Sequence, residues 1–310
     1  MNRRARSGQQ VRRPTVRVRF VLTMLALITI AALMIIPTAL GAVFMLVLTA
    51  PGCGDEDDPA AAGMTAESVT FPSGADAVET PAYFIPAADP NGATVLFIPT
   101  GNAGRGWGMG SIAVYHDAGF DVLTYSSRVC RTVNSLGALE SYPVADALAY
   151  LRTRPEVDPG RIGVHGFSAG GASAILAAAL YPEIAAVVAV GNYENFAAQV
   201  DASLPGNLGL LAPFFRIAAQ TTYRARTGID WSALDPIGVI NAIAPRPILL
   251  IYGSGEPGLS GGRAMAAKSG AALVIVPGVG HGGYLHTPEA AAVYTEALVG
   301  FMGRALDGAG

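Results

Sequence analysis

Charged residues are scarce in this sequence, and those present are unevenly distributed. Only 14% of the 310 residues are Asp, Glu, Lys or Arg, whereas 51% are hydrophobic. Residues 1–50 hold seven of the 20 basic residues and no acid, which leaves 13 basic and 23 acidic residues, a net charge of −10, for residues 51–310. Because phosphate binding requires a basic surface, this acidic body excludes nucleic acid as the expected partner.

Cysteine is rare as well. With two cysteines, Cys53 and Cys130, the sequence offers neither a disulfide framework nor the ligand spacing of a metal site. A bridge between the two is one interpretation, and two free thiols are another. The segment Ala-Pro-Gly-Cys that ends at Cys53 bears a weak likeness to a bacterial lipid-attachment site, so a lipid-modified Cys53 is the third.

Nucleotide-binding motifs are missing too. The glycine-rich segment 100–106 lacks the lysine of G-x-x-x-x-G-K-[ST] and does not match G-x-G-x-x-G, so it is not expected to hold a nucleotide. The sequence carries no cofactor or metal signature, and none is expected.

What the sequence does contain is a long uncharged run near its start. Residues 20–50 include no charged side chain, and a helix of that length exceeds the roughly 30 Å hydrocarbon core of a bilayer. The run is far longer than the ~7–15 residues of a secretory signal core, which favours a retained single-pass anchor over a cleaved signal. Pro37 is expected to kink the helix or to mark one end of the span.

The distribution of charge predicts an orientation for this anchor. Arginines cluster in residues 1–19, and the acidic residues Asp55 to Asp58 follow the anchor. The positive-inside rule therefore predicts a cytoplasmic N-terminus, a cell-membrane location and an extracytoplasmic body. Residues 51–66, rich in Gly, Pro, Ala and acid, are expected to form a solvated linker.

The remaining chain, residues 67–310, alternates short apolar runs with helical patterns. This alternation predicts an α/β fold, a mostly parallel sheet with helices on both faces. Residues 194–236 interrupt it and are expected to form a small helical cap over the strand ends. The expected strands cover residues 69–71, 82–85, 93–98, 121–125, 162–167, 185–190, 247–252 and 272–276, and the expected helices cover 112–118, 141–154, a small-residue segment after 168, and 288–306.

One strand–turn–helix segment carries a candidate nucleophile. Gly166-Phe-Ser-Ala-Gly170 matches G-x-S-x-G, with a strand-like run before it and a helix of small residues after it. Glycine on both sides permits the tight turn that exposes the hydroxyl of Ser168. A structural glycine turn is the alternative interpretation, and the partners of Ser168 weigh against it.

A serine nucleophile needs a base, and the base needs an orienting acid. Of the four histidines, His281 lies in a glycine-rich loop after the last strand, whereas His165 is expected to be structural and His116 and His286 to lie at the surface. Glu256 follows the preceding strand, and Glu194 is the rival acid. The order Ser168, Glu256, His281 is the Ser–acid–His order of one particular fold.

Four segments together resemble the α/β-hydrolase family over roughly residues 67–306. They are the serine turn, Gly101-Asn-Ala-Gly104, Ala244-Pro-Arg-Pro-Ile-Leu-Leu-Ile-Tyr-Gly253 and Pro277-Gly-Val-Gly-His281. They are most similar to the broad esterase, dienelactone-hydrolase-like and peptidase-like group.

The resemblance implies that Ser168 is the nucleophile, His281 the general base and Glu256 the orienting carboxylate. It also implies an oxyanion hole formed by the backbone N–H groups of Ala169 and Asn102.

Three departures from the family pattern stand out. Thr100 replaces the usual histidine before the oxyanion glycine, and Glu256 replaces the usual aspartate. Dienelactone hydrolases proper use a cysteine nucleophile where this chain has Ser168, so their chemistry is not implied.

The sequence thus predicts a membrane-anchored serine hydrolase that cleaves an ester of a small-molecule or acyl substrate. A peptidase or amidase of the same fold is one alternative, and a non-catalytic binding protein that retains the fold is another. The apolar residues at 204–215 indicate a hydrophobic substrate, unless they are apolar because they pack on the sheet.

Overall fold

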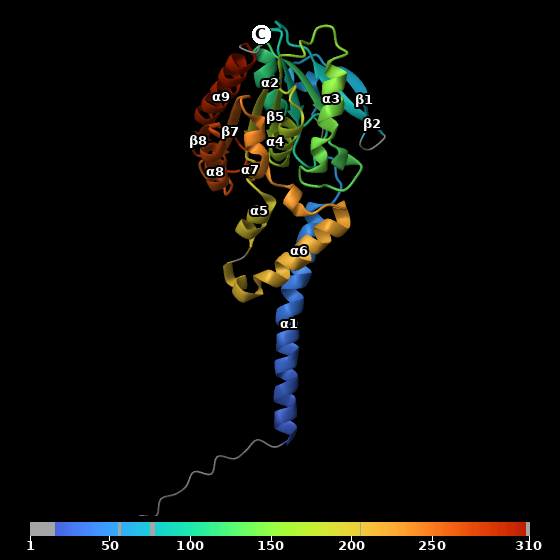
Figure 1. Ribbon diagram of the computed structural model, residues 1–310, viewed down its shortest axis with the longest axis vertical. Helices are drawn as coiled ribbons and strands as arrows, with labels where there is room; N and C mark the ends of the chain where they lie inside the picture. Colours follow the sequence, from blue (N-terminus) through green and yellow to red (C-terminus); the bar gives the residue numbers. More distant parts are fainter. Residues whose placement is uncertain (1–15, 55–56, 75–77, 205, 308–310) are drawn as a thin grey trace, which may run out of the picture.

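The structure is a computed structural model that describes residues 16–54, 57–74, 78–204 and 206–307 (Figure 1). The arginines before residue 16 lie outside the described residues, as do Asp55 and Glu56. The part of the predicted membrane orientation that depends on these charges therefore rests on the sequence alone.

A single twisted sheet of eight strands forms the centre of the described body, in the order β1-β2-β4-β3-β5-β6-β7-β8. The two pairs β1–β2 and β2–β4 are antiparallel, and all the other pairs are parallel. The expected strands are all present, most within two residues of the expected ends. The strands are β1 (Glu67–Ser73), β2 (Val78–Ile85), β3 (Thr94–Ile98), β4 (Asp121–Tyr125), β5 (Ile162–Phe167), β6 (Ala186–Val190), β7 (Ile248–Gly253) and β8 (Ala272–Val276).

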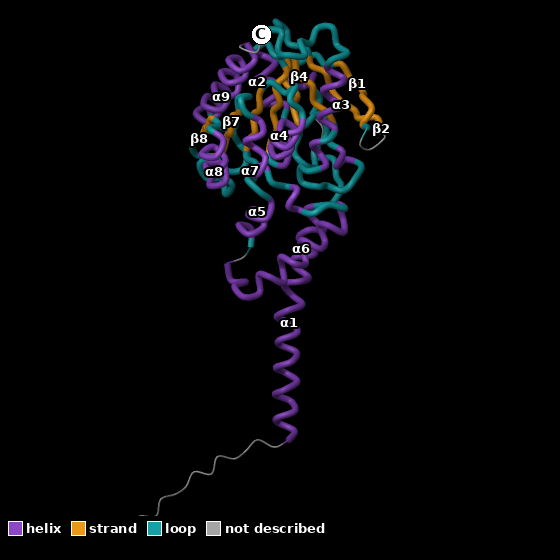
Figure 2. Tube along the Cα trace, viewed as in Figure 1, coloured by secondary structure: helices purple, strands orange, loops and turns teal. Residues whose placement is uncertain are grey.

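Helices cover both faces of this sheet (Figures 1 and 2). One buried cluster joins α3, α4 and α8 to the sheet, and a second joins α2 and α9 to its other face. The α-helices are α1 (Val16–Leu48), α2 (Met109–Asp117), α3 (Pro143–Leu151), α4 (Ala169–Leu180), α5 (Phe196–Ser203), α6 (Ala212–Thr227), α7 (Pro236–Val239), α8 (Leu259–Ser269) and α9 (Pro288–Asp307). The short 3₁₀ helices are η1 (Pro59–Ala62), η2 (Arg128–Cys130), η3 (Leu139–Ser141), η4 (Gly206–Leu211), η5 (Trp231–Ala233) and η6 (Ile240–Ile243).

The parallel strands bring their carboxyl ends to one edge of the sheet. Phe167, the last residue of β5, pairs with Val190 at the end of β6, and Val190 pairs in turn with Ile251 of β7. The loops that carry Ser168, Glu256 and His281 follow β5, β7 and β8. The register therefore gathers the three predicted residues at one place.

The N-terminal helix α1 runs without a break for 33 residues and contains Pro37. It is the one helix among the described residues that is long and apolar enough to cross a membrane. Its residues before Pro37 are almost all exposed, whereas Pro37, Gly41 and Met45 are buried. These three are spaced four apart, so they form one face of the helix, and this face packs against α6 (Figure 1).

The segment after α1 differs from the solvated linker that its composition predicts. The N–H of Gly52 donates to the carbonyl of Val129, at 3.0 Å, and Cys53 forms a disulfide bond with Cys130. Met64 is 3% exposed and belongs to the core under α2 and α9. The described part of this segment is therefore attached to the body, and the disulfide excludes free thiols and a lipid-modified Cys53 in this structure.

The cap expected at residues 194–236 is helical and consists of α5, η4, α6 and η5. Its buried residues do not form a layer on the sheet. Instead Phe196, Phe215 and Tyr223 pack with one another and with Met45 of α1 in a third cluster. The apolar side chains of the cap therefore join α1 to the body.

Candidate active site

Ser168 lies at the turn between β5 and α4, in a backbone conformation that residues other than glycine rarely adopt. Its φ is 56° and its ψ is −121°, and its N–H donates to the carbonyl of Val190 at 2.7 Å. A Cβ on Gly166 would collide with the backbone of Gly170. A Cβ on Gly170 would lie 2.5 Å from the carbonyl oxygen of Pro99, at the end of β3. Both glycines are needed for the turn to close, as the G-x-S-x-G pattern predicts.

Hydrogen bonds join the serine to the predicted base and acid. His281 Nε2 lies 3.0 Å from Ser168 Oγ, and His281 Nδ1 lies 2.5 Å from Glu256 Oε1. The imidazole thus contacts the hydroxyl with one nitrogen and the carboxylate with the other. A carboxylate at Nδ1 holds the proton there, so that Nε2 is free to accept the serine proton.

The carboxylate of Glu256 is buried and fixed from two further sides. Its side chain is 1% exposed, and its Oε2 accepts hydrogen bonds from Tyr284 Oη at 2.7 Å and from the N–H of Gly253 at 3.0 Å. Burial, and secondly the hydrogen bond to the carboxylate, raise the pKa of Tyr284, so the phenol stays protonated and donates. Tyr284 was not found by sequence reasoning, because one tyrosine beside the histidine loop carries no pattern.

The rival acid, Glu194, lies elsewhere. Its carboxylate packs so closely on α8 that a Cβ at Gly261 would collide with it. Its backbone carbonyl accepts from the N–H of Ile237 at 2.9 Å, which fixes the segment between β6 and α7. The structure thus brings Glu256, and not Glu194, to His281.

The two predicted oxyanion donors, Ala169 and Asn102, lie at the start of α4 and in the loop after β3, the strand next to β5. Ala169 is the first residue of α4, so its N–H has no acceptor within the helix. The loop that holds Asn102 is fixed by neighbours: Asn134 Nδ2 donates to Asn102 Oδ1 at 3.1 Å, and the N–H of Gly54 donates to the Asn102 carbonyl at 2.7 Å. The segment after α1 therefore supports this loop, a contact that no local pattern predicts.

A cavity of about 380 Å³ opens beside Ser168 and His281. Leu136, Tyr193, Phe196 and Val200 form much of its wall. Two further side chains, Phe44 and Leu48, come from the last turns of α1. Their part in the cavity was missed by sequence reasoning, because hydropathy assigns them to the membrane anchor. The volume lies within the range of small-molecule sites.

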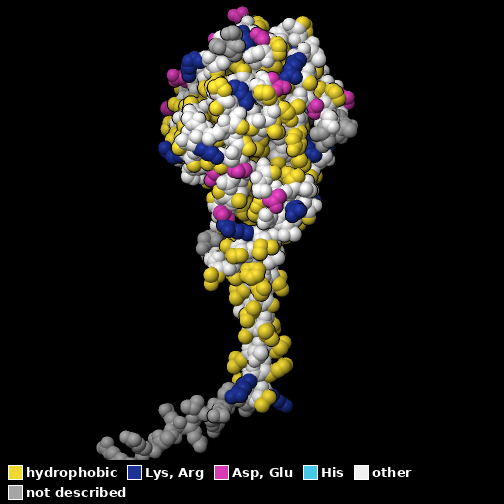
Figure 3. Space-filling view, viewed as in Figure 1, with side chains coloured by type: hydrophobic (Ala, Val, Ile, Leu, Met, Phe, Trp, Pro, Cys, Tyr) yellow, Lys and Arg dark blue, Asp and Glu magenta, His cyan; other side chains and the backbone are white. Residues whose placement is uncertain are grey.

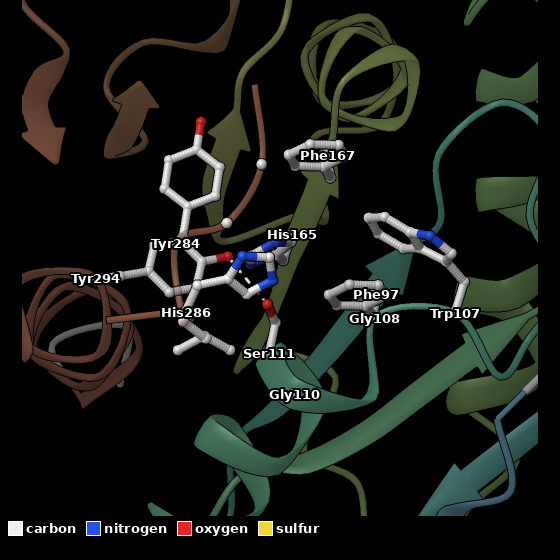
Figure 4. Close-up of a pocket in the computed structure, with 13 residues that line it drawn as sticks. Phe97, Trp107, Gly108, Gly110, Ser111, His165, Phe167, Tyr284, His286 and Tyr294 are labelled. Carbon is white, nitrogen blue, oxygen red and sulfur yellow. Dashed lines mark hydrogen bonds between the residues drawn. The ribbon is translucent and has the colours of Figure 1, made fainter. Parts of the chain in front are cut away.

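A second cavity, of about 190 Å³, is lined in part by residues 282–286 of the loop that follows β8 (Figure 4). Aromatic side chains such as Phe97 and Trp107 line it, and the hydroxyls of Ser111 and Tyr294 point toward one another at 3.1 Å. Neither Ser168 nor Glu256 lines this space, so it is separate from the predicted triad.

The other histidines are not part of the triad. His165 is fully buried, its Nδ1 lies 2.9 Å from Tyr115 Oη, and burial lowers its pKa to about 3. It is thus neutral and structural, as expected. His286 is exposed, as expected, and His116 is partly buried, with a side chain that is 13% exposed and that pairs with the exposed Asp117 at the surface. Among the described residues, no group of three or more His, Cys, Asp or Glu is arranged to hold a metal ion.

Comparison with solved structures identifies the architecture. An esterase of Pyrococcus furiosus superposes with a TM-score of 0.64 at 18% identity, over 84% of this chain and 98% of that one. The chain has the α/β-hydrolase fold. Carboxyl esterase 2 of the fungus Tuber melanosporum superposes on this fold with a TM-score of 0.62 at 18% identity, over 82% of this chain and 90% of the esterase.

Similarity in sequence to known proteins covers limited stretches of the chain. The model of the dienelactone hydrolase family matches residues 126–203. A thiohydrolase of Arthrinium phaeospermum, apmlB, is 37% identical over 82 residues, which are 24% of this chain and 27% of that protein. This chain therefore spans about a quarter of the length of the curated relative that it matches.

Proposed function

We propose that this α/β-hydrolase is a membrane-anchored serine esterase. The observation that carries the proposal is the continuous hydrogen-bonded series from Glu256 through His281 to Ser168, at 2.5 and 3.0 Å. The similarity to the dienelactone hydrolase family over residues 126–203 supports hydrolysis as the general reaction.

The reaction follows from these contacts. Ser168 Oγ attacks the ester carbonyl carbon while its proton passes to His281 Nε2, and the N–H groups of Ala169 and Asn102 stabilise the oxyanion. The tetrahedral intermediate collapses, the C–O bond to the alcohol breaks, and His281 returns the proton to the leaving alcohol. Water then attacks the acyl-enzyme in the same manner and releases a carboxylic acid and free Ser168.

An ester is favoured over an amide because an alkoxide leaves with less protonation than an amine requires. The apolar walls formed by Phe196 and Val200 suit an acyl group rather than a charged peptide. A thioester, the class of bond that the name of the thiohydrolase relative indicates, is cleaved by the same steps.

Membrane anchorage is the second part of the proposal. The apolar helix α1 supports a single span, and Arg17 and Arg19 at its start favour a cytoplasmic N-terminus. The Cys53–Cys130 bridge is consistent with an oxidising compartment for the body.

Labelling of the full chain in detergent with a fluorophosphonate, read by intact mass, tests the triad. We expect one adduct, its absence in Ser168→Ala, and its retention in Ser111→Ala, a serine of the second cavity. An adduct that persists in Ser168→Ala would show that the nucleophile is another residue, whereas no adduct on the folded wild-type chain would favour the binding-protein alternative. Parallel assays with p-nitrophenyl butyrate and the matching anilide separate esterase from amidase activity.

A further inference from the structure

The cavity that holds Ser168 is built partly from the proposed membrane anchor. Phe44 and Leu48 lie four residues apart, so they project from the same face of α1, and both line the cavity. The ring of Phe44 also contacts Phe215 of α6, with centroids 5.6 Å apart. The helix is therefore a wall of the substrate cavity as well as a candidate span.

This wall is firmly attached to the body. Met45 and Thr49 are fully buried, and Arg226 of α6 donates to Thr49 from Nε to Oγ1 and from Nη2 to the carbonyl, each at 3.2 Å. The N–H of Asn134 donates to the same carbonyl at 3.2 Å. With the disulfide of Cys53 just beyond, the end of α1 has a fixed position beside the cavity.

The length of the exposed part of α1 locates the membrane surface. The exposed part of α1 is uncharged from Phe20 to Ile36, about 25 Å at ~1.5 Å per residue, slightly less than the roughly 30 Å hydrocarbon core, and Arg17 and Arg19 lie at its outer end. Burial begins at Pro37, where α1 meets the body. Phe44 lies only seven residues later, about 10 Å along the helix, so the cavity begins close to the bilayer surface.

The part of the cap that adjoins α1 carries exposed apolar side chains. Leu210 is 95% exposed and Ile217 is 64% exposed, and both belong to elements, η4 and α6, that contact α1. Figure 3 shows hydrophobic side chains continuing from α1 onto the adjoining end of the body. Single exposed apolar residues are ordinary on a soluble surface, but beside a membrane span they indicate an edge that enters the interface.

The charge of the cavity limits the substrates that it suits. Among the described residues that line it, Glu256 is the only Asp, Glu, Lys or Arg, and its carboxylate accepts a hydrogen bond from Tyr284 and contacts His281. No Lys or Arg is among these lining residues, so a phosphate or carboxylate near Ser168 would lack a counter-charge. A neutral ester fits, and an anionic headgroup does not.

We infer that the substrate is a neutral ester of a long acyl chain, held in the bilayer, whose acyl chain enters the cavity between α1 and α5. The inference rests on the proposed esterase function and adds the substrate class and the route of entry. Ser168 takes the acyl group from the alcohol, and water releases it as a fatty acid. The resulting carboxylate finds no cation in the cavity, which favours its departure to the interface.

The test uses the full chain reconstituted in phosphatidylcholine vesicles, with 4-methylumbelliferyl oleate in the same bilayer and 4-methylumbelliferyl butyrate in the water. Leu48→Trp fills the cavity from α1, and Val47→Trp, at a position that is 67% exposed, is the matched control. We expect the ratio of oleate to butyrate hydrolysis to fall at least tenfold in Leu48→Trp and to stay unchanged in Val47→Trp. An equal ratio in both variants would overturn the inference.

Dilution of the vesicles tests the route. If the acyl chain enters the cavity from the bilayer, the rate of oleate hydrolysis per enzyme molecule stays constant as the vesicles are diluted, because enzyme and ester share one membrane. A rate that falls with dilution would mean entry from water and would overturn the route. Butyrate hydrolysis without oleate hydrolysis would refute this inference and leave the esterase proposal intact, whereas the loss of both, with no fluorophosphonate adduct, would refute the proposed function itself.

Discussion

At the scale of residues, the sequence indicates the chemical groups of the site but not their surroundings. Ser168 and His281 are predictable because glycine spacing and position after a strand are local properties. The choice between Glu256 and Glu194 is not, because it depends on which side chain turns toward the histidine. Glu194 packs on Gly261 of α8, a contact between distant segments that no local pattern reports.

Replacing Glu256 by Gln tests this assignment. The amide keeps the shape of the side chain but no longer holds the Nδ1 proton of His281 or stabilises the imidazolium. We expect kcat for a soluble ester to fall by roughly 10²–10⁴, with a small change in KM. Glu194→Gln is the matched control and should retain kcat within about threefold. A larger loss in the control than in Glu256→Gln would reverse the assignment.

At the scale of elements, apolar runs predict the strands well because the central strands are buried on both faces. Helix α8 was not predicted, because Gly261 and Gly262 lower the helix propensity of its first turn. The structure requires both glycines: side chains there would collide with Glu194 and with the ring of Tyr252. Composition also failed for residues 51–66, where Met64 and Cys53 attach the chain to the body.

The helices α1 and α6 are in close backbone contact at Gly41. A Cβ at Gly41 would collide with the backbone of Phe215, so a larger side chain must push the helices apart. We expect Gly41→Leu to destabilise the protein in detergent by about 1–3 kcal/mol. Thermal unfolding measures the effect, and Ala39→Leu, at an exposed position of the same helix, should leave the midpoint nearly unchanged. Equal midpoints for the two variants would contradict the α1–α6 contact.

At the scale of the whole molecule, the sequence predicts an anchor and an α/β-hydrolase body as separate parts. Hydropathy cannot distinguish the faces of a helix that is apolar all round, so it did not show that the last twelve residues of α1 pack on the body. A fragment without α1, such as residues 60–310, therefore lacks part of the cavity wall and the partner of Cys130.

The disulfide gives a prediction at this scale, because it closes the chain across 77 residues. We expect Cys53→Ser and Cys130→Ser each to lower the free energy of unfolding by about 2–4 kcal/mol. Since both remove one bridge, the double variant should lose no more than either single variant. Unfolding with and without reductant measures this, and the reductant should affect the wild type alone. Additive losses would show that the two thiols act independently.

Because Phe44 and Leu48 belong to the cavity wall, proteolytic cleavage near Ala50 would change the active site. A cleavable signal peptide usually serves only to target the protein, and the mature protein is complete without it. Here the released body would keep its nucleophile, base and acid, but the cavity beside them would lose the wall that α1 forms and would be open on that side. Shedding would therefore alter which molecules this protein can select, in addition to where it resides.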